Sequence, residues 1–219
     1  MLLSYLYDNF IEEAEFARDC GLSPEALDAM GKARVMPSAS YVYKTAGQSA
    51  SFVSEYTEEA TYRFHLKGHK QWMTALARFG ICSEDRARRY FFHRYDGAKE
   101  MFLTGQPGAA LVDAAPDVAQ QFDAAYAEQT WENFLAGVYG VCTTDGQPET
   151  VFLKQAGVLF IEALSAQGPA HLTGDRLALL GTCVDFLDQV EAAFAPHEVA
   201  QTSRQRCITD IRAQYFHAV

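Results

Sequence analysis

The sequence predicts a mainly α-helical protein whose N-terminal part forms a helix-turn-helix-like unit with a small strand or wing. Three observations support this fold class. Two short helical segments flank a Gly-Leu-Ser-Pro turn near the N-terminus, one stretch with strand propensity follows them, and apolar residues then recur at helical spacing. We expect the helix-turn-helix-like unit over residues 1–57 and a multi-helix bundle domain over residues 58–219.

The boundaries of the first unit follow from its capping residues. Residues 12–20 have a helical pattern, and Gly21 suits the left-handed residue that ends a helix. Ser23 and Pro24 suit the N-cap and the first position of a second helix. Residues 40–44 then have strand propensity. This order resembles a winged or MerR-type helix-turn-helix start.

The remaining chain is predicted to be helical after a short break. Residues 46–57 are rich in Ser, Gly and Thr, which suits a linker or the second strand of a small wing. From about residue 58 the spacing of apolar residues is that of helices. Glycine, proline and capping residues bound the expected helices, which cover residues 62–79, 84–104, 116–127, 131–141, 148–167, 174–194 and 199–215.

The composition is that of a globular protein and disfavours two classes of partner. The chain has 219 residues, of which 49% are hydrophobic, so it can bury a core without disulfides or structural metals. Its net charge of −10 repels phosphate backbones and anionic lipid surfaces. We therefore expect neither nucleic acid nor a membrane as its partner. No apolar run approaches the roughly 20 residues that a membrane helix needs.

The cysteines and the N-terminus indicate the compartment. There are five cysteines, an odd number without a CxxC pair, which is typical of reduced thiols in a cytoplasmic protein. The first eight residues lack a basic region and lead into Glu12 and Glu13, so we expect no signal peptide.

Two histidines are the only metal-ligand candidates that the spacing suggests. His65 and His69 are four residues apart and would share one face of a helix, as in some metal sites. No glutamate follows the first histidine, Gly68 weakens a helix there, and no third ligand has a telling spacing. We favour two ordinary histidines over a metal site.

A glycine-containing helical stretch holds the first candidates for ligand binding. Gly137 and Gly140 bracket Tyr139, and Cys142 follows. Glycines allow a backbone or a ligand to approach closely. A reactive thiol would need a nearby base or cation, which only the fold could supply from Lys154 or His197. The alternative is tight helix packing around a buried, inert cysteine.

A polar cluster near the C-terminus holds the other candidates. His197 lies near the start of the last predicted helix, and Ser203 and Arg204 follow on that helix and suit the binding of a carboxylate or phosphate. Helix capping and surface ion pairs would use the same residue types. The candidate ligand-binding residues are therefore Tyr139, Cys142, Lys154, His197, Ser203 and Arg204. The sequence contains no signature that assigns a catalytic residue, a reaction or a cofactor.

Three stretches together resemble one family of uncharacterised bacterial proteins, known only as a domain of unknown function. Some members of that family are labelled natural-product biosynthesis proteins. The resemblance covers most of the chain, implies an architecture and a biosynthetic context, and transfers no catalytic residue. The stretches are YLYDNFIEEAEFARDCGLSPEALDAMGKARVMPSASYVY, WENFLAGVYGVCTTDGQPETVFLKQ and VDFLDQVEAAFAPHEVAQTSRQRCITDIR.

Three functions fit these observations. The first is a small-molecule-binding or accessory protein of a biosynthetic pathway, with a pocket in the helical domain. The second is a protein-interaction or dimerisation module, for which a homodimer is one form. These two rank nearly level. A helix-turn-helix transcriptional regulator ranks third, because residues 1–45 hold four basic against seven acidic side chains, a net charge of −3.

Overall fold

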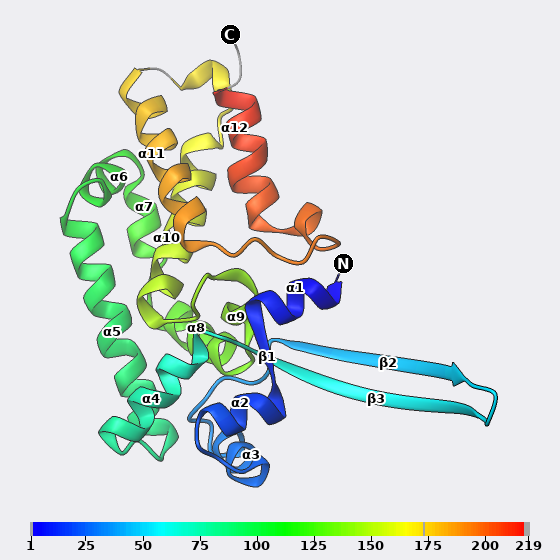
Figure 1. Ribbon diagram of the computed structural model, residues 1–219. Coiled ribbons are helices and arrows are strands. Elements are labelled where there is room, and N and C mark those ends of the chain that lie inside the picture. The colour runs from blue at the N-terminus through cyan, green and yellow to red at the C-terminus, as the bar shows by residue number, and fades with distance from the viewer. Residues whose placement is uncertain (1, 173, 217–219) are drawn as a thin grey trace.

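The computed structural model describes residues 2–172 and 174–216, which form a mainly helical body and one long β-hairpin that projects from it (Figure 1). The predicted helical class is confirmed, and a small antiparallel sheet accompanies the helices. None of the described helices has both the length and the apolar character that crossing a membrane requires.

Two of the N-terminal helices begin and end close to where the capping residues predict, and a helix and a short strand that were not predicted precede them. Helix α1 (Leu2–Asn9) leads into strand β1 (Phe10–Glu12), helix α2 (Glu13–Asp19) and helix α3 (Pro24–Lys32). Ser23 caps α3, because its hydroxyl accepts a hydrogen bond of 3.2 Å from the amide of Ala26.

The sheet has the strand order β1-β3-β2, and both pairings are antiparallel. Strand β2 (Tyr41–Ala50) pairs along its full length with residues 55–64 of strand β3 (Glu55–Leu66), whereas β1 pairs only with the last three residues of β3. Position 57, at which we divided the chain, lies inside β3, and the division into two units stays a prediction.

The predicted helix over residues 62–79 is wrong at its start, where the chain continues as β3. Phe64 and Leu66 point into a small apolar cluster that also holds Leu6 and Phe10, whereas the residues before Phe64 are exposed. Pairing with β1 and β2 satisfies the backbone there, and the helix begins only at His69. Strand pairing therefore overrides the local helical spacing.

The body consists of helices that pack around one apolar core. The long helix α10 packs against both α5 and α11, and its Phe152 and Phe160 are buried. Phe91 of α5 is buried against Trp131 and Phe134 of α8. The helices of the body are α4 (His69–Phe79), α5 (Glu84–Thr104), α6 (Gly108–Ala114), α7 (Pro116–Gln120), α8 (Ala124–Leu135), α9 (Val138–Cys142), α10 (Pro148–Ser165), α11 (Gly174–Val190) and α12 (Asp210–Tyr215).

Three predicted helices are divided in the structure. In the predicted helix over residues 116–127, residues 121–123 separate α7 from α8. A turn at Gly137, which has a φ of 77°, separates α8 from α9. A Cβ there would lie 2.6 Å from the carbonyl oxygen of Ser38, so glycine lets the segment after α3 approach closely. The C-terminal stretch is divided into a 3-10 turn (Val199–Gln201), a π-helix (Arg204–Thr209) and α12.

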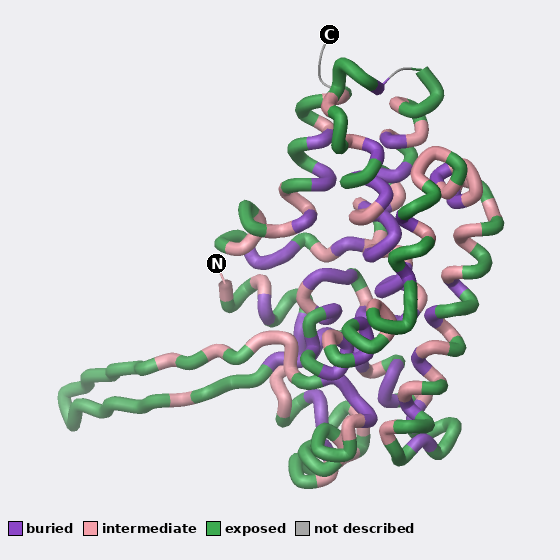
Figure 2. Tube along the Cα trace, turned by 180° about the vertical axis from the view of Figure 1, so that it is seen from behind, coloured by how far each residue is buried: buried purple, intermediate pink, exposed green. Residues whose placement is uncertain are grey.

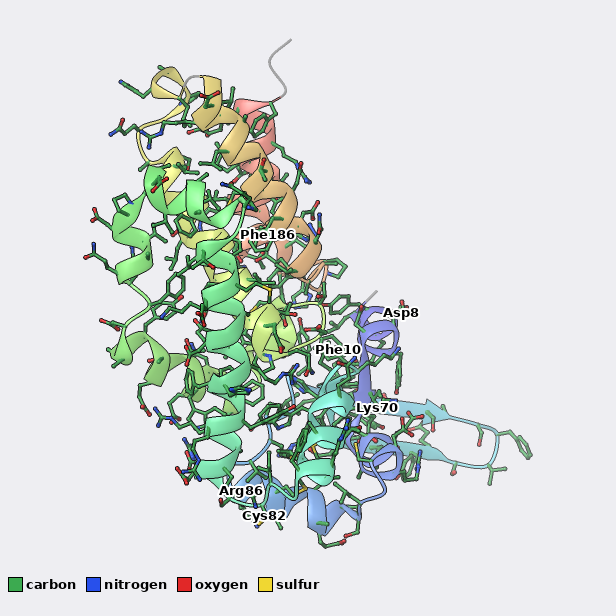
Figure 3. All side chains as sticks on the ribbon, turned by 90° about the vertical axis from the view of Figure 1, so that its left-hand side faces the viewer. Asp8, Phe10, Lys70, Cys82, Arg86 and Phe186 are labelled. Carbon is green, nitrogen blue, oxygen red and sulfur yellow. The ribbon has the colours of Figure 1, made fainter. Side chains whose placement is uncertain are left out.

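The N-terminal helices share the core of the body. Phe16 and Leu27 belong to the same buried cluster as the aromatic residues of α5 and α10. Trp72 of α4 donates a hydrogen bond of 2.8 Å from Nε1 to the carbonyl oxygen of Val35, three residues after the end of α3. Lys70 of α4, labelled in Figure 3, forms an ion pair of 3.0 Å with an acid at the end of α2. These contacts fix α2, α3 and the segment that leads into β2 to the helical body.

Candidate functional site

Four of the six predicted ligand-binding residues converge on a buried carboxylate that the sequence did not point to. Cys142 ends α9, Lys154 lies on α10, and Ser203 and Arg204 begin the π-helical turn. All four surround the end of α11, where Glu191 is 1% exposed. We call these five residues the Glu191 cluster.

Most polar atoms of the Glu191 cluster have hydrogen-bond or ion-pair partners within the protein. The Ser203 hydroxyl donates to Oε1 of Glu191, and Nζ of Lys154 lies 3.8 Å from the same oxygen. Arg204 donates from Nε to the carbonyl oxygen of Ala192 at 3.0 Å and forms an ion pair of 2.5 Å with Asp188. Oε2 of Glu191 is buried and has no hydrogen-bond partner among the described residues. The cluster thus joins α9, α10 and α11 to the C-terminal turn.

Spacing was the signal that could have identified Glu191. The buried residues Leu180, Val184 and Leu187 of α11 are separated by four and three residues, and Glu191 comes four residues later in the same series. An acid at the next position of an apolar stripe is predicted to be buried and therefore paired. The sequence prediction instead continued the stripe through Val190.

Burial has the largest effect on the acidity of Glu191 and raises the pKa of its carboxyl, although Ser203 and Lys154 favour the charged form. The folded chain then holds this proton more tightly than the unfolded chain. The contribution to stability is therefore greatest below the ordinary value of 4.5 and is lost as the pH rises through the raised pKa.

Glu191→Gln is expected to stabilise the protein relative to the wild type at neutral pH, by about 1 kcal/mol, and to lose this advantage near pH 4. The measurement is the free energy of urea unfolding of both proteins across this pH range. Glu128→Gln is the control, because Glu128 is exposed and pairs with Arg88 at the surface. A wild type that gains stability over Glu191→Gln as the pH rises would contradict the assignment.

The other two predicted residues lie elsewhere. Tyr139 is buried, and its hydroxyl accepts a hydrogen bond of 2.7 Å from Nε2 of Gln155, which also binds Thr130 and Tyr95. His197 is largely exposed and lies 3.9 Å from a carboxylate oxygen of Glu198. The structure therefore does not unite all six residues in one site.

Cys142 has the properties of a protonated, buried thiol. Burial raises its pKa, and this effect exceeds the opposing charge of Lys154. A thiolate nucleophile requires the reverse balance. The environment of Cys142 therefore supports a packing role.

The two candidate metal ligands flank a turn instead of sharing a helix face. His65 lies on β3 with Nε2 3.4 Å from Oε2 of Glu13, and its ring stacks on Phe16 with centroids 4.5 Å apart. His69 is the first residue of α4 and is fully buried. Among the described residues, no group of three or more His, Cys, Asp or Glu side chains is arranged to hold a metal ion.

Both histidines make stability sensitive to acid. Burial, together with the nearby charge of His65, lowers the pKa of His69 to about 3, and burial also lowers the pKa of His65. The folded chain thus favours neutral imidazole, and this contribution is lost as the pH falls from the ordinary value of 6.5 toward 3.

For His69 alone we expect a loss of about 3 kcal/mol in unfolding free energy between pH 7 and pH 4. The variant His69→Gln should show a correspondingly flatter pH dependence, measured by urea unfolding. His93→Gln is the control, because His93 is exposed. Equal pH dependence in the wild type and His69→Gln would refute the prediction.

The projecting hairpin is the most exposed part of the described chain. We call residues 44–62 the arm. Every residue from Ala46 to Glu59 is exposed, as the outer hairpin in Figure 2 shows. The tip carries Phe52, which is completely exposed, and Val53, which is 75% exposed. Figure 3 shows the side chains of the arm clear of the helical body.

Charge divides the two strands of the arm. Glu55, Glu58 and Glu59 all lie on β3, whereas Lys44 is the one charged residue on the β2 side. Strand β2 forms one edge of the arm. Strand β3 forms the other edge, because the short β1 does not extend along the arm. One edge of the arm is therefore acidic and the other nearly neutral.

A groove lies where the arm joins the body. Its volume is about 480 Å³, and it is bounded by α3, by residues 36–39 and by the base of both long strands. Leu27, Met36 and Val42 form the apolar part of its lining, and Arg63 lies opposite Val42 across the strands. The charged or titratable residues that line it are Glu13, Asp28, Lys32, Arg63 and His65. We call this cavity the base groove.

Comparison with known proteins gives one match. The model of a family of unknown function (DUF6058) matches residues 87–216, which extend from α5 to α12. No curated protein and no solved structure matches the chain. The match agrees with the resemblance to an uncharacterised family that the sequence indicates.

Proposed function

The chain belongs to the DUF6058 family of unknown function, and we propose that it acts as a protein-interaction module that docks through its arm. The observation that carries this proposal is the unbroken exposure of residues 46–59. A two-stranded ribbon is marginally stable alone in water, and its edges carry unpaired backbone groups. Such an element, ending in Phe52 and Val53, suits contact with another protein.

The charge of the N-terminal elements favours a protein partner over DNA. The exposed residues of α3 include Glu25 and Asp28, and Lys32 is engaged by Asp28 at 2.6 Å. The arm adds three glutamates on β3. A DNA-binding winged unit concentrates positive charge on its second helix and its wing. The helix-turn-helix-like order of elements therefore supports a role as the platform of the arm.

The small-molecule hypothesis has weaker geometric support. Four predicted residues meet in the Glu191 cluster, and one carboxylate oxygen there is unpartnered. The side chain of Glu191 is nevertheless completely buried, and the groups around it bind one another. The base groove lies apart from this cluster. We therefore rank a binding protein or accessory protein of a biosynthetic pathway second.

Site-specific photo-crosslinking tests the proposal. A photoreactive phenylalanine analogue replaces Phe52 at the tip of the arm or, as a matched control, Phe79, which is 50% exposed on α4. In cells that produce the chain, we expect covalent protein adducts at position 52 and few at position 79. Absence of adducts at position 52, or equal yields at both positions, would refute docking through the arm. The mass of each adduct identifies its partner.

A further inference from the structure

We propose that the partner of the arm is a second copy of this chain: β2 pairs antiparallel with β2 of the other copy across a two-fold axis, and the tip of each arm enters the base groove of the other. This inference rests on the proposed docking function of the arm. In this arrangement a second copy of the chain occupies both the free edge of β2 and the base groove.

The free edge of β2 is open to strand addition. In the strand order β1-β3-β2, β2 is an edge strand of ten residues, and in the described chain nothing pairs with its outer side. Edge strands are usually protected by charges, proline or bulges. The strand β2 has one lysine and no proline, so its backbone can accept another strand.

Symmetry and charge select β2 as the strand that pairs. Most homodimers are closed by a two-fold axis, which places identical surfaces against each other. Pairing β3 with β3 would bring Glu55, Glu58 and Glu59 of both copies together, and like charges opposite one another destabilise a sheet. Pairing β2 with β2 leaves these acids on the two outer edges. The result is a four-stranded sheet with a nearly neutral centre.

The length of β2 brings the tip to the groove. In a pairing centred on Ala46, Ala50 at the end of β2 lies opposite Val42 of the second copy, which lines the base groove. Phe52 follows two residues later, in the turn at the tip of the arm. Residues opposite each other share a face of the sheet, so even-numbered residues of both copies lie on the face of Val42.

The groove offers an apolar floor with charged groups around it. Leu27, Met36 and Val42 give an apolar contact surface, and a volume of about 480 Å³ is within the range of cavities that hold small organic groups. The same groove is also lined by Glu13, Asp28, Lys32, Arg63 and His65. Phe52 and Val53 are exposed apolar residues next to each other at the point that arrives there. Their burial would remove the most exposed aromatic side chain from water.

Disulfide trapping distinguishes this arrangement from others. In a Cys82→Ser background, which removes the exposed cysteine, Ala46→Cys is placed on the axis and Glu59→Cys directly opposite it on β3. In the pairing we propose, the two copies of position 46 have Cα atoms about 5 Å apart, whereas those of position 59 are about 14 Å apart. Mild oxidation should therefore give covalent dimers only from Ala46→Cys. Dimers from Glu59→Cys, or none from Ala46→Cys, would overturn the β2 pairing.

Sedimentation equilibrium of the full chain completes the test. We expect a dimer, a dissociation constant raised about tenfold or more by Phe52→Ser, and no change with Phe79→Ser. A variant in which Asn-Gly replaces residues 46–59 should be monomeric, and its urea stability should match that of the wild type at concentrations at which the wild type is also monomeric. A wild type that is monomeric at all concentrations refutes self-pairing. If position 52 then crosslinks to a different protein, docking through the arm still holds, and if it crosslinks to nothing, both proposals fail.

Discussion

Gly68→Ala is expected to lose about 3 kcal/mol or more of unfolding free energy. A Cβ at position 68 would lie 2.1 Å from the carbonyl oxygen of Asp145 and 2.7 Å from its carbon. These are backbone atoms of the turn between α9 and α10, which cannot move as a side chain would. The same turn is fixed by Gln147, whose Nε2 donates a hydrogen bond of 3.0 Å to the carbonyl oxygen of Gly68. The link between β3 and α4 would therefore separate from the body.

Gly97→Ala is the matched control for this substitution. Gly97 lies inside α5, and a Cβ there would meet nothing within 4 Å. Alanine should stabilise the helix by about 0.5–1 kcal/mol because it restricts the unfolded chain. Urea unfolding followed by circular dichroism compares the two variants. If Gly68→Ala is as stable as the wild type, the close approach of residues 68 and 145 is wrong.

Trp72→Ala should lose about 3–5 kcal/mol of unfolding free energy. Trp72 is completely buried, with its ring centroid 4.9 Å from that of Phe134. Its removal leaves a cavity between α4 and α8 and deprives the carbonyl oxygen of Val35 of its partner. Because Val35 lies three residues after the end of α3, this loss falls on the junction that holds the N-terminal elements against the body.

Two further variants separate these effects. Trp72→Phe keeps much of the ring but removes the donor, so it should lose about 1–3 kcal/mol, less than alanine. Phe79→Ala on the same helix removes an exposed ring and should change stability by about 0.5 kcal/mol or less. Circular dichroism is the suitable probe, since it does not depend on the tryptophan. A loss at Phe79 equal to that at Trp72 would contradict the packing of α4.

The elements that could be predicted are those whose boundaries depend on interactions between residues close in the sequence. The helix boundary at Ser23 depends on a hydrogen bond within four residues, and a single sequence contains that information. The arm was predicted only as a linker or a second strand of a small wing. Its residues 46–59 contact no core, so they show no alternation between apolar and polar residues. The length of the pairing between β2 and β3 was for this reason not predictable.

The candidate site was predictable in part for the same reason. Residue type indicated Lys154, Ser203 and Arg204 as candidate polar groups, and folding brings them to the end of α11. Their partner Glu191 was missed because an acid is ordinarily exposed, and only its spacing from Leu187 indicates that it is buried. His65 and His69 were placed on one helix because long-range pairing, which puts His65 on β3, leaves no local trace.

Hydrogen exchange of the arm tests the central claim, that this chain docks through its arm to a second copy, most directly. Full-length protein is labelled in heavy water at low and at high protein concentration, and deuterium uptake is measured in peptides that cover β2 and, for comparison, α10. The account predicts that the amides of β2 exchange quickly at low concentration and become protected as concentration rises, whereas α10 is unchanged. Rapid exchange of β2 at every concentration would contradict it.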